Sequence, residues 1–188
     1  MRLVSFAAFI LFMATCPVAA GQRGVAVNGV RLSVACDPSQ STLQISALNV
    51  SQMPVLLTFG ALIGAGFHDY LFRLIVTIPQ GQDLRVIYTG APGAVGGRID
   101  PLVIPLVPGA VYSVAVPLSL FYVLDANTPL QEYIRRPGRL RAELNVEHAA
   151  CPLYGYPNPN MIPCWHGRLV SNILVMPLGR ASTRIQSK

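Results

Sequence analysis

The sequence predicts an all-β protein, an antiparallel β-sandwich of about 7–9 strands with at most one short helical turn. Three observations lead to this fold class. The 188 residues include 16 glycines and 16 prolines, which fall between short apolar runs and mark turns. Several of these runs alternate apolar and polar residues with a period of two, as half-buried strands do. No segment carries the apolar spacing of a long helix.

The first twenty residues are typical of a secretory signal peptide. Arg2 supplies a positive start, residues 3–20 carry no charge, and Val18 and Ala20 fit the small-residue positions of a cleavage site. We therefore expect export, and a mature protein that starts at Gly21 in the periplasm or outside the cell. Two alternatives stay open. The segment is retained as an anchor, since its uncharged run approaches the roughly 20 residues that span a bilayer, or a lipid on Cys16 anchors the protein to the outer membrane.

The remaining residues suit a single domain, so we expect one β-sandwich over residues 21–178 and a flexible basic tail over residues 179–188. Only 12% of the residues are charged, against about 25% in a typical globular protein. We infer that a partner or a second copy covers part of the surface. The formal net charge is +6. We do not interpret it as a nucleic-acid footprint, because an exported protein rarely meets nucleic acid.

Eight strands are expected, each bounded by turn residues. They cover residues 25–35, 42–50, 55–62, 70–78, 84–89, 111–124, 140–146 and 169–178. Residues 100–109 carry a proline every three or four positions and are expected to form an edge strand or an extended connector. Thr128, Pro129 and Gln131 predict one short helical turn, with a threonine cap, a first-turn proline and a capping-box glutamine.

The clearest alternation lies in residues 139–146. Its apolar members are expected in the core and its polar members in solvent, because successive side chains of a strand point to opposite faces. The same period in residues 72–78, followed by turn residues 79–83, predicts a hairpin. The residues expected to be buried are Leu140, Ala142, Leu144, Val146, Phe72, Leu74 and Val76, and those expected to face solvent include Arg139, Arg141, Glu143 and Arg73.

Turn motifs spread over most of the mature chain add a family resemblance. Asn49-Val50-Ser51 forms an N-x-S turn between two expected strands, and is a β-turn in preference to a glycosylation site. Pro-Gly turns stand at 108–109 and 137–138, the first before a strand that ends in Leu-Ser and an aromatic residue, and Ser171-Asn172 opens the last strand. These features resemble exported bacterial immunoglobulin-like β-sandwich domains, although Leu140 stands where such domains commonly carry a tyrosine. Similar domains include protease-inhibitor-like modules and envelope proteins.

The sequence shows no motif that combines a nucleophile with a base, as a hydrolase requires. The histidines are His68, His148 and His166, and no serine or cysteine lies in a G-x-S-x-G setting. Glu143 and Glu147 are the closest pair of acids, and they share the solvent face of one strand. We therefore expect no catalytic residue, no metal and no cofactor.

The loop between Cys151 and Cys164 is the main predicted binding site. An oxidising compartment favours a disulfide between these two cysteines, which leaves Cys36 as an odd thiol. Four prolines stiffen the loop, so its amphipathic side chains suit contact with a partner. The predicted contact residues are Tyr154, Tyr156, Asn158, Asn160 and Trp165. Two alternatives stay open: the tyrosines pack over an open end of the sandwich, or His148 and His166 join the cysteines in a zinc site.

Arg135 and Arg136 form a second candidate site. With the nearby strand arginines they concentrate positive charge, so we predict that they contact an anion. We thus expect an exported, non-enzymatic binding or structural domain of the bacterial envelope that contacts a protein or an envelope component. The first alternative is an inhibitor or accessory factor of a secreted protease, and the second is a hydrolase or metal-binding protein. Homo-oligomer formation is left open.

Overall fold

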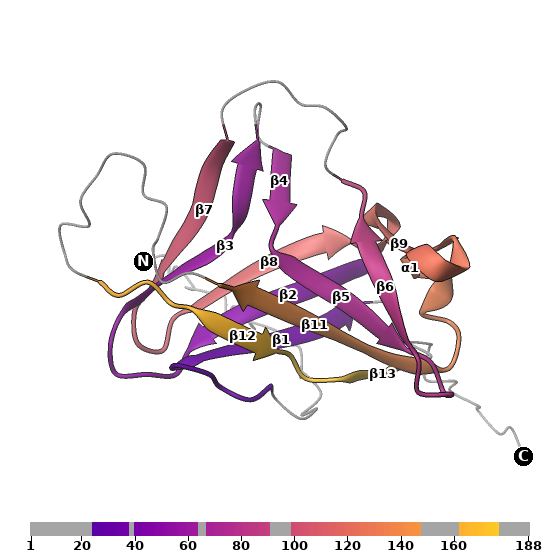
Figure 1. Ribbon diagram of the computed structural model, residues 1–188, viewed down its shortest axis with the longest axis horizontal. Helices are drawn as coiled ribbons and strands as arrows, with labels where there is room; N and C mark the ends of the chain where they lie inside the picture. Colours follow the sequence, from indigo (N-terminus) through magenta and orange to yellow (C-terminus); the bar gives the residue numbers. More distant parts are fainter. Residues whose placement is uncertain (1–23, 38–39, 64–66, 91–98, 148–161, 177–188) are drawn as a thin grey trace, which may run out of the picture.

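The computed structural model describes residues 24–37, 40–63, 67–90, 99–147 and 162–176 (Figure 1). These residues form thirteen β-strands that are joined into antiparallel sheets. Together the sheets make an all-β sandwich, which confirms the predicted fold class. The thirteen strands exceed the 7–9 expected, and the described residues form three short helical turns where at most one was expected. Within the described segments, no helix is long and apolar enough to cross a membrane.

A large sheet forms the front layer of the sandwich in Figure 1. Its strand order is β10-β9-β6-β5-β11-β12, and β13 also pairs with β11. The strands are β5 (Phe72–Thr77), β6 (Asp83–Tyr88), β9 (Phe121–Val123), β10 (Thr128–Pro129), β11 (Gly138–Val146), β12 (Gly167–Val170) and β13 (Leu174–Met176).

Two smaller sheets complete the fold. The back sheet lies behind the large sheet in the order β1-β2-β8, and the side sheet has the order β4-β3-β7 (Figure 1). Their strands are β1 (Val30–Asp37), β2 (Thr42–Asn49), β8 (Val111–Pro117), β4 (Phe67–Tyr70), β3 (Val55–Ile63) and β7 (Ile99–Leu106). Residues 100–109 were expected as an edge strand or a connector, and most of them form β7, an edge strand that tolerates Pro101 and Pro105.

The core lies between the large sheet and the back sheet. All seven residues predicted to be buried in β5 and β11 are buried, and Arg73 and Arg139 are exposed. The period-two interpretation of these strands is therefore confirmed. The side sheet joins the same core through Phe59, whose ring lies 5.8 Å from that of Phe72 and 5.3 Å from that of Tyr112.

Two predicted strands are interrupted. The run 111–124 was expected as one strand, but β8 ends at Pro117, because proline cannot donate a ladder hydrogen bond, and a 3-10 turn (Leu118–Leu120) precedes β9. Residues 169–178 were also expected as one strand. Here Ser171 and Asn172 separate β12 from β13, so this pair does not open the last strand as the family resemblance implied.

The predicted helical turn exists as α1 (Leu130–Tyr133), but the predicted cap is wrong. Pro129 takes the N-cap position, and no side chain caps the turn. The Thr128 hydroxyl donates to the carbonyl of Ala126 at 2.8 Å, and the Gln131 amide nitrogen contacts Ser41 Oγ at 3.3 Å. A second 3-10 turn (Leu124–Ala126) precedes this segment and supplies the carbonyl that Thr128 binds.

Asn49 forms the corner where β2 leaves the back sheet. Its buried amide nitrogen donates to the carbonyls of Met53 and Leu106, each at 2.8 Å. Its Oδ1 accepts from the backbone nitrogen of Ser51 at 2.9 Å and from the Ser51 hydroxyl at 2.7 Å. The predicted turn at Asn49-Val50-Ser51 is thus confirmed, and the asparagine has a structural role.

Candidate binding surface

Five arginines lie on the outer face of the large sheet. On β11 the residues that alternate with the buried Leu140, Ala142 and Leu144 point outward. Residues that pair with these positions on neighbouring strands lie on the same outer face. Arg73 lies opposite Glu143, and Arg168 lies opposite Asn145. Ile75 lies opposite Arg141 on one side and Arg85 on the other. We call this surface the arginine face, and its five arginines are Arg73, Arg85, Arg139, Arg141 and Arg168.

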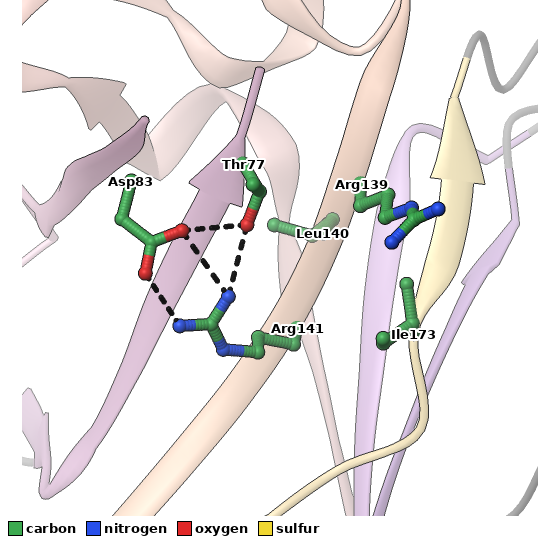
Figure 2. A pocket seen from close by; sticks show the side chains of 6 residues that line it. All are labelled: Thr77, Asp83, Arg139, Leu140, Arg141 and Ile173. Atoms are coloured by element: carbon green, nitrogen blue, oxygen red, sulfur yellow. Dashed lines mark hydrogen bonds and ion pairs between the residues drawn. The ribbon is translucent and has the colours of Figure 1, made fainter. Parts of the chain in front are cut away.

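Arg141 is held by side chains from two neighbouring strands (Figure 2). Its Nη2 lies 2.7 Å from Asp83 Oδ2, and its Nη1 lies 3.3 Å from Asp83 Oδ1. The same Nη1 donates to Thr77 Oγ1 at 2.9 Å, and the Thr77 hydroxyl donates to Asp83 Oδ1 at 2.6 Å. Because these residues come from β11, β6 and β5, the cluster ties three strands together.

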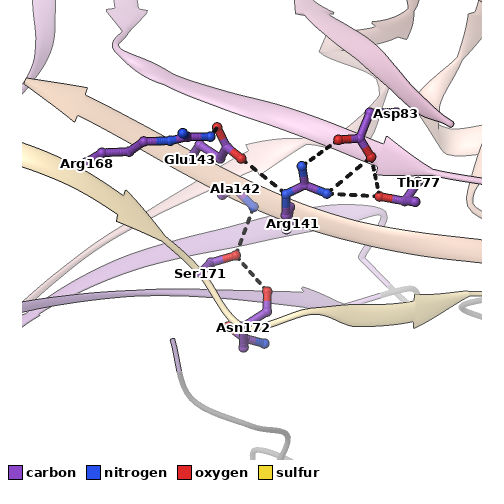
Figure 3. A network of polar contacts seen from close by, with 8 residues as sticks. All are labelled: Thr77, Asp83, Arg141, Ala142, Glu143, Arg168, Ser171 and Asn172. Carbon is purple, nitrogen blue, oxygen red and sulfur yellow. Dashed lines mark hydrogen bonds and ion pairs between the residues drawn. The ribbon is translucent and has the colours of Figure 1, made fainter. Parts of the chain in front are cut away.

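A second carboxylate extends this cluster toward the edge of the sheet (Figure 3). Glu143 Oε1 accepts from Arg141 Nε at 3.2 Å, and Glu143 Oε2 accepts from Arg168 Nη2 at 2.8 Å. Both carboxylates on the strands of this face are therefore engaged by Arg141 and Arg168. Arg141 and Glu143, which the alternation predicts to face solvent, are half-buried and bound to each other.

The electrostatics of the cluster follow from these contacts. The hydrogen bond from Arg141, and after it the one from Thr77, holds the pKa of Asp83 below its ordinary value. In return, the hydrogen bond to Asp83 raises the pKa of Arg141. The pair is ionised at neutral pH, so it stabilises the sheet and leaves Arg141 few donors for a ligand.

Three arginines of the face have all their side-chain donors open to a ligand. Arg73, Arg85 and Arg139 are exposed, and among the described residues none of them has an ion pair or a side-chain hydrogen bond. Glu147, one residue beyond β11, is the next acid, and its Oε1 lies 3.3 Å from the amide nitrogen of Asn145. The face therefore carries an excess of positive charge that its own acids do not neutralise.

Two hollows lie at the arginine face, and the arginines that line them are Arg139, Arg141 and Arg168. The first, of about 210 Å³, is lined by Thr77, Asp83, Arg139, Leu140, Arg141 and Ile173 (Figure 2). The second, of about 360 Å³, lies at the sheet edge and is lined by Gly24, Val25, Val27, Arg168, Val170, Ser171, Asn172 and Ile173. Ile173 lines both hollows. The first is bordered by charge and the second mainly by aliphatic side chains.

The residues predicted as the main binding site are not brought together in the described part of the chain. Tyr154, Tyr156, Asn158, Asn160 and Cys151 lie outside it, as do the signal peptide with Cys16, His148 and the basic tail. The Cys151–Cys164 disulfide and the binding loop therefore stay predictions.

Trp165 lies in the core instead of at the surface. Only 3% of it is exposed, and its indole nitrogen donates to the carbonyl of Val27 at 2.9 Å. Next to it, Cys164 lies beside Leu56 of β3, where backbone hydrogen bonds from Leu56 to Pro163 and from Trp165 to Leu56 hold the chain. Trp165 is thus a structural anchor after the predicted loop.

The remaining candidates have separate positions. Arg135 and Arg136 are exposed after α1, with the Arg136 guanidinium 5.0 Å from the centre of the Tyr133 ring, and their anion contact stays a prediction. His166 is exposed, and its carbonyl accepts from the Asn28 amide. Across the described ranges, no three histidine, cysteine or acidic residues gather as metal ligands.

Cys36 carries a free thiol that is half-buried in β1. Burial, together with the neighbouring charge of Asp37, raises its pKa to about 11. The thiol is therefore protonated at neutral pH and weakly reactive, because the thiolate is the nucleophile.

The sequence alone did not identify Arg73, Arg85 and Arg168 as candidate anion contacts. The alternation in residues 72–78 already placed Arg73 on the side of its strand that faces away from the core. What the sequence lacked was the strand order β6-β5-β11-β12, which brings residues that are far apart in the chain onto one face. Comparison with protein-family models, curated proteins and solved structures finds no match to this chain.

Proposed function

We propose that this chain is an exported, non-enzymatic binding domain that contacts an anionic partner in the bacterial envelope through the arginine face. One observation carries the proposal: Arg73, Arg85 and Arg139 are exposed without an acidic partner, while both carboxylates on the same strands are bound by Arg141 and Arg168. The signal-peptide pattern supports the exported location. The immunoglobulin-like resemblance of the turn motifs fits the same kind of module.

The spacing of the three arginines favours an extended anionic partner. They stand on β6, β5 and β11, which are neighbouring strands. Arg139 pairs with Thr77, four residues from Arg73, so these two positions lie about 14 Å apart along the strands. This spacing is wide for one small anion that has to contact all three side chains. A partner with several negative groups does.

The polar cluster itself favours binding over catalysis. The acidic and basic side chains of the cluster are hydrogen-bonded to one another, and Arg141 donates to Asp83, Thr77 and Glu143. Such a cluster ties together the strands that carry Arg73, Arg85 and Arg139. Electrostatic attraction then supplies the contact with the partner, and this contact weakens as salt increases.

Dextran sulfate is a suitable soluble probe for this proposal. Binding is measured by fluorescence anisotropy of a labelled dextran sulfate for the mature protein, for the triple variant R73Q/R85Q/R139Q, and for the matched control R180Q/R184Q/K188Q in the basic tail. The first triple variant should weaken binding by roughly tenfold or more, since each arginine near a charged surface contributes on the order of 1 kcal/mol.

The control removes the same number of charges and should weaken binding by much less. The unfolding temperature of R73Q/R85Q/R139Q should match that of the parent protein, because these three side chains have no ion pair among the described residues. The unfolding temperature of the control is measured alongside it. Equal losses in the two triple variants would show that only net charge matters, and would contradict the proposed site.

A further inference from the structure

We propose that the anionic partner is the surface of a bilayer containing anionic phospholipid, with the aliphatic hollow at the sheet edge receiving apolar parts of the lipid. The inference rests on the proposed function of the arginine face. It commits that face to an amphiphile, a molecule with both an anionic and an apolar part.

Aliphatic side chains stand between the arginines of the face. Val175 lies opposite Arg139, and Ile75 lies opposite both Arg85 and Arg141. Val175 is 71% exposed, and Ile87 is also exposed on β6. A soluble polyanion makes no use of such residues, because its groups are hydrated. A membrane interface does, since binding there combines apolar burial with attraction to anionic headgroups.

The second hollow has the chemistry of an amphiphile site. Its lining is aliphatic at Val25, Val27, Val170 and Ile173, and Arg168 stands at the same hollow. Val25 is 78% exposed and Ile173 is 43% exposed, so apolar surface is open to solvent there. Arg168 is 64% exposed at its side chain, and Glu143 engages it through one nitrogen only. Its other donors remain for a phosphate.

The two hollows differ in chemistry as the two parts of a phospholipid do. Ile173 lines both, so the aliphatic hollow and the one bordered by Arg139 are neighbours. A headgroup phosphate near Arg139 or Arg168 then lies within reach of apolar surface. The basic residues of the face are all arginines, whose planar guanidinium binds phosphate oxygens in pairs.

The test separates lipid binding from binding to any polyanion. Mature protein, purified from the compartment to which it is exported, is sedimented with vesicles of equal parts phosphatidylglycerol and phosphatidylcholine, and with vesicles of phosphatidylcholine alone. We expect binding to the first and little to the second. R73Q/R85Q/R139Q should lose most of this binding.

A pair of serine variants tests the apolar part. V25S/I173S should weaken binding to the anionic vesicles by about tenfold through lost apolar burial, while leaving binding to dextran sulfate within about twofold. The matched control V107S/V111S removes two equally exposed valines outside both hollows and should change neither.

Two results would overturn the inference. The protein binds dextran sulfate through the arginine face but ignores the anionic vesicles, or V25S/I173S sediments with them as well as the parent does. In both cases the proposed function stands. The first result makes the partner a soluble polyanion or an acidic protein, and the second shows that the vesicles are bound through headgroup charge without the aliphatic hollow. If the protein binds neither dextran sulfate nor vesicles, the proposed function fails together with the inference.

Discussion

At the scale of single residues, polar side chains decide the local geometry of this fold. Asn49 is the clearest case, because it is buried and each polar atom of its amide makes two hydrogen bonds. A β-turn was predictable from Asn49-Val50-Ser51. The carbonyl of Leu106, which lies 57 residues away, was not, because nothing in the sequence of either segment indicates that they meet.

Replacing Asn49 tests its structural role. Asn49→Ala leaves the buried carbonyl of Leu106 without its donor, and should lower the free energy of unfolding by about 2–3 kcal/mol. Asn49→Asp should be destabilising too, because it keeps the acceptor for Ser51 and loses both donors. Urea unfolding measures the effect, with the exposed Asn145→Ala as a control that should change stability by less than about 0.5 kcal/mol. An Asn49→Ala variant as stable as the control would show that the corner does not depend on this amide.

The Asp83–Arg141 pair makes a pH-dependent contribution. The pKa of Asp83 is lower in the folded protein than in the unfolded chain, so the ionised carboxylate favours folding. This stability is present above the unfolded value, near pH 4, and is lost as the pH falls through the lower folded value.

Comparing the parent protein with Asp83→Asn measures this contribution. The difference in unfolding free energy should be at most about 1 kcal/mol at pH 7, because half-exposed ion pairs are screened by solvent. It should stay constant down to about pH 5 and shrink below about pH 4. A difference that grows as the pH is lowered would contradict the contacts described for Asp83.

At the scale of elements, the break between β12 and β13 joins the two layers of the sandwich. The Ser171 hydroxyl accepts from the backbone nitrogen of Ala142 at 2.8 Å and donates to the carbonyl of Asn172 at 2.7 Å. Asn172 then reaches the edge of the back sheet, where its Oδ1 accepts from the Val34 nitrogen at 2.7 Å and its Nδ2 donates to the Val34 carbonyl at 2.9 Å. The side-chain amide thus replaces a neighbouring strand at the edge of β1.

Hydrogen exchange at one position tests this bridge. Asn172→Ala should speed exchange of the Val34 amide by tenfold or more, since its acceptor is gone, and should lower stability by about 1–2 kcal/mol. The backbone amides of Leu43 and Ile45, on the central strand of the back sheet, serve as references. Their exchange rates should change only as much as the global stability of the protein changes. Unchanged protection of Val34 relative to these two would rule out the bridge.

At the scale of the whole molecule, the sequence predicted the layers better than their connections. Alternation identified β5 and β11 and their buried faces, because one side of each strand packs on the core. It did not show that Ser171 and Asn172 divide a strand, since that break depends on Ala142 and Val34 in other segments. Pro117 was visible in the sequence, but β7 contains two prolines, so a proline alone does not identify the end of a strand. The candidate surface has the same limit, because Arg73, Arg85 and Arg139 become one site only through strand order.

The central claim is that the arginine face is the binding surface, and nuclear magnetic resonance tests it most directly. Short dextran sulfate is titrated into isotope-labelled mature protein while the backbone amide and arginine Nε signals are followed. The account predicts that the largest shifts fall at Arg73, Arg85 and Arg139 and on the strands that carry them, and that the back sheet is unaffected. Shifts confined to residues 179–188 or to the back sheet, with the arginine face unchanged, would contradict it.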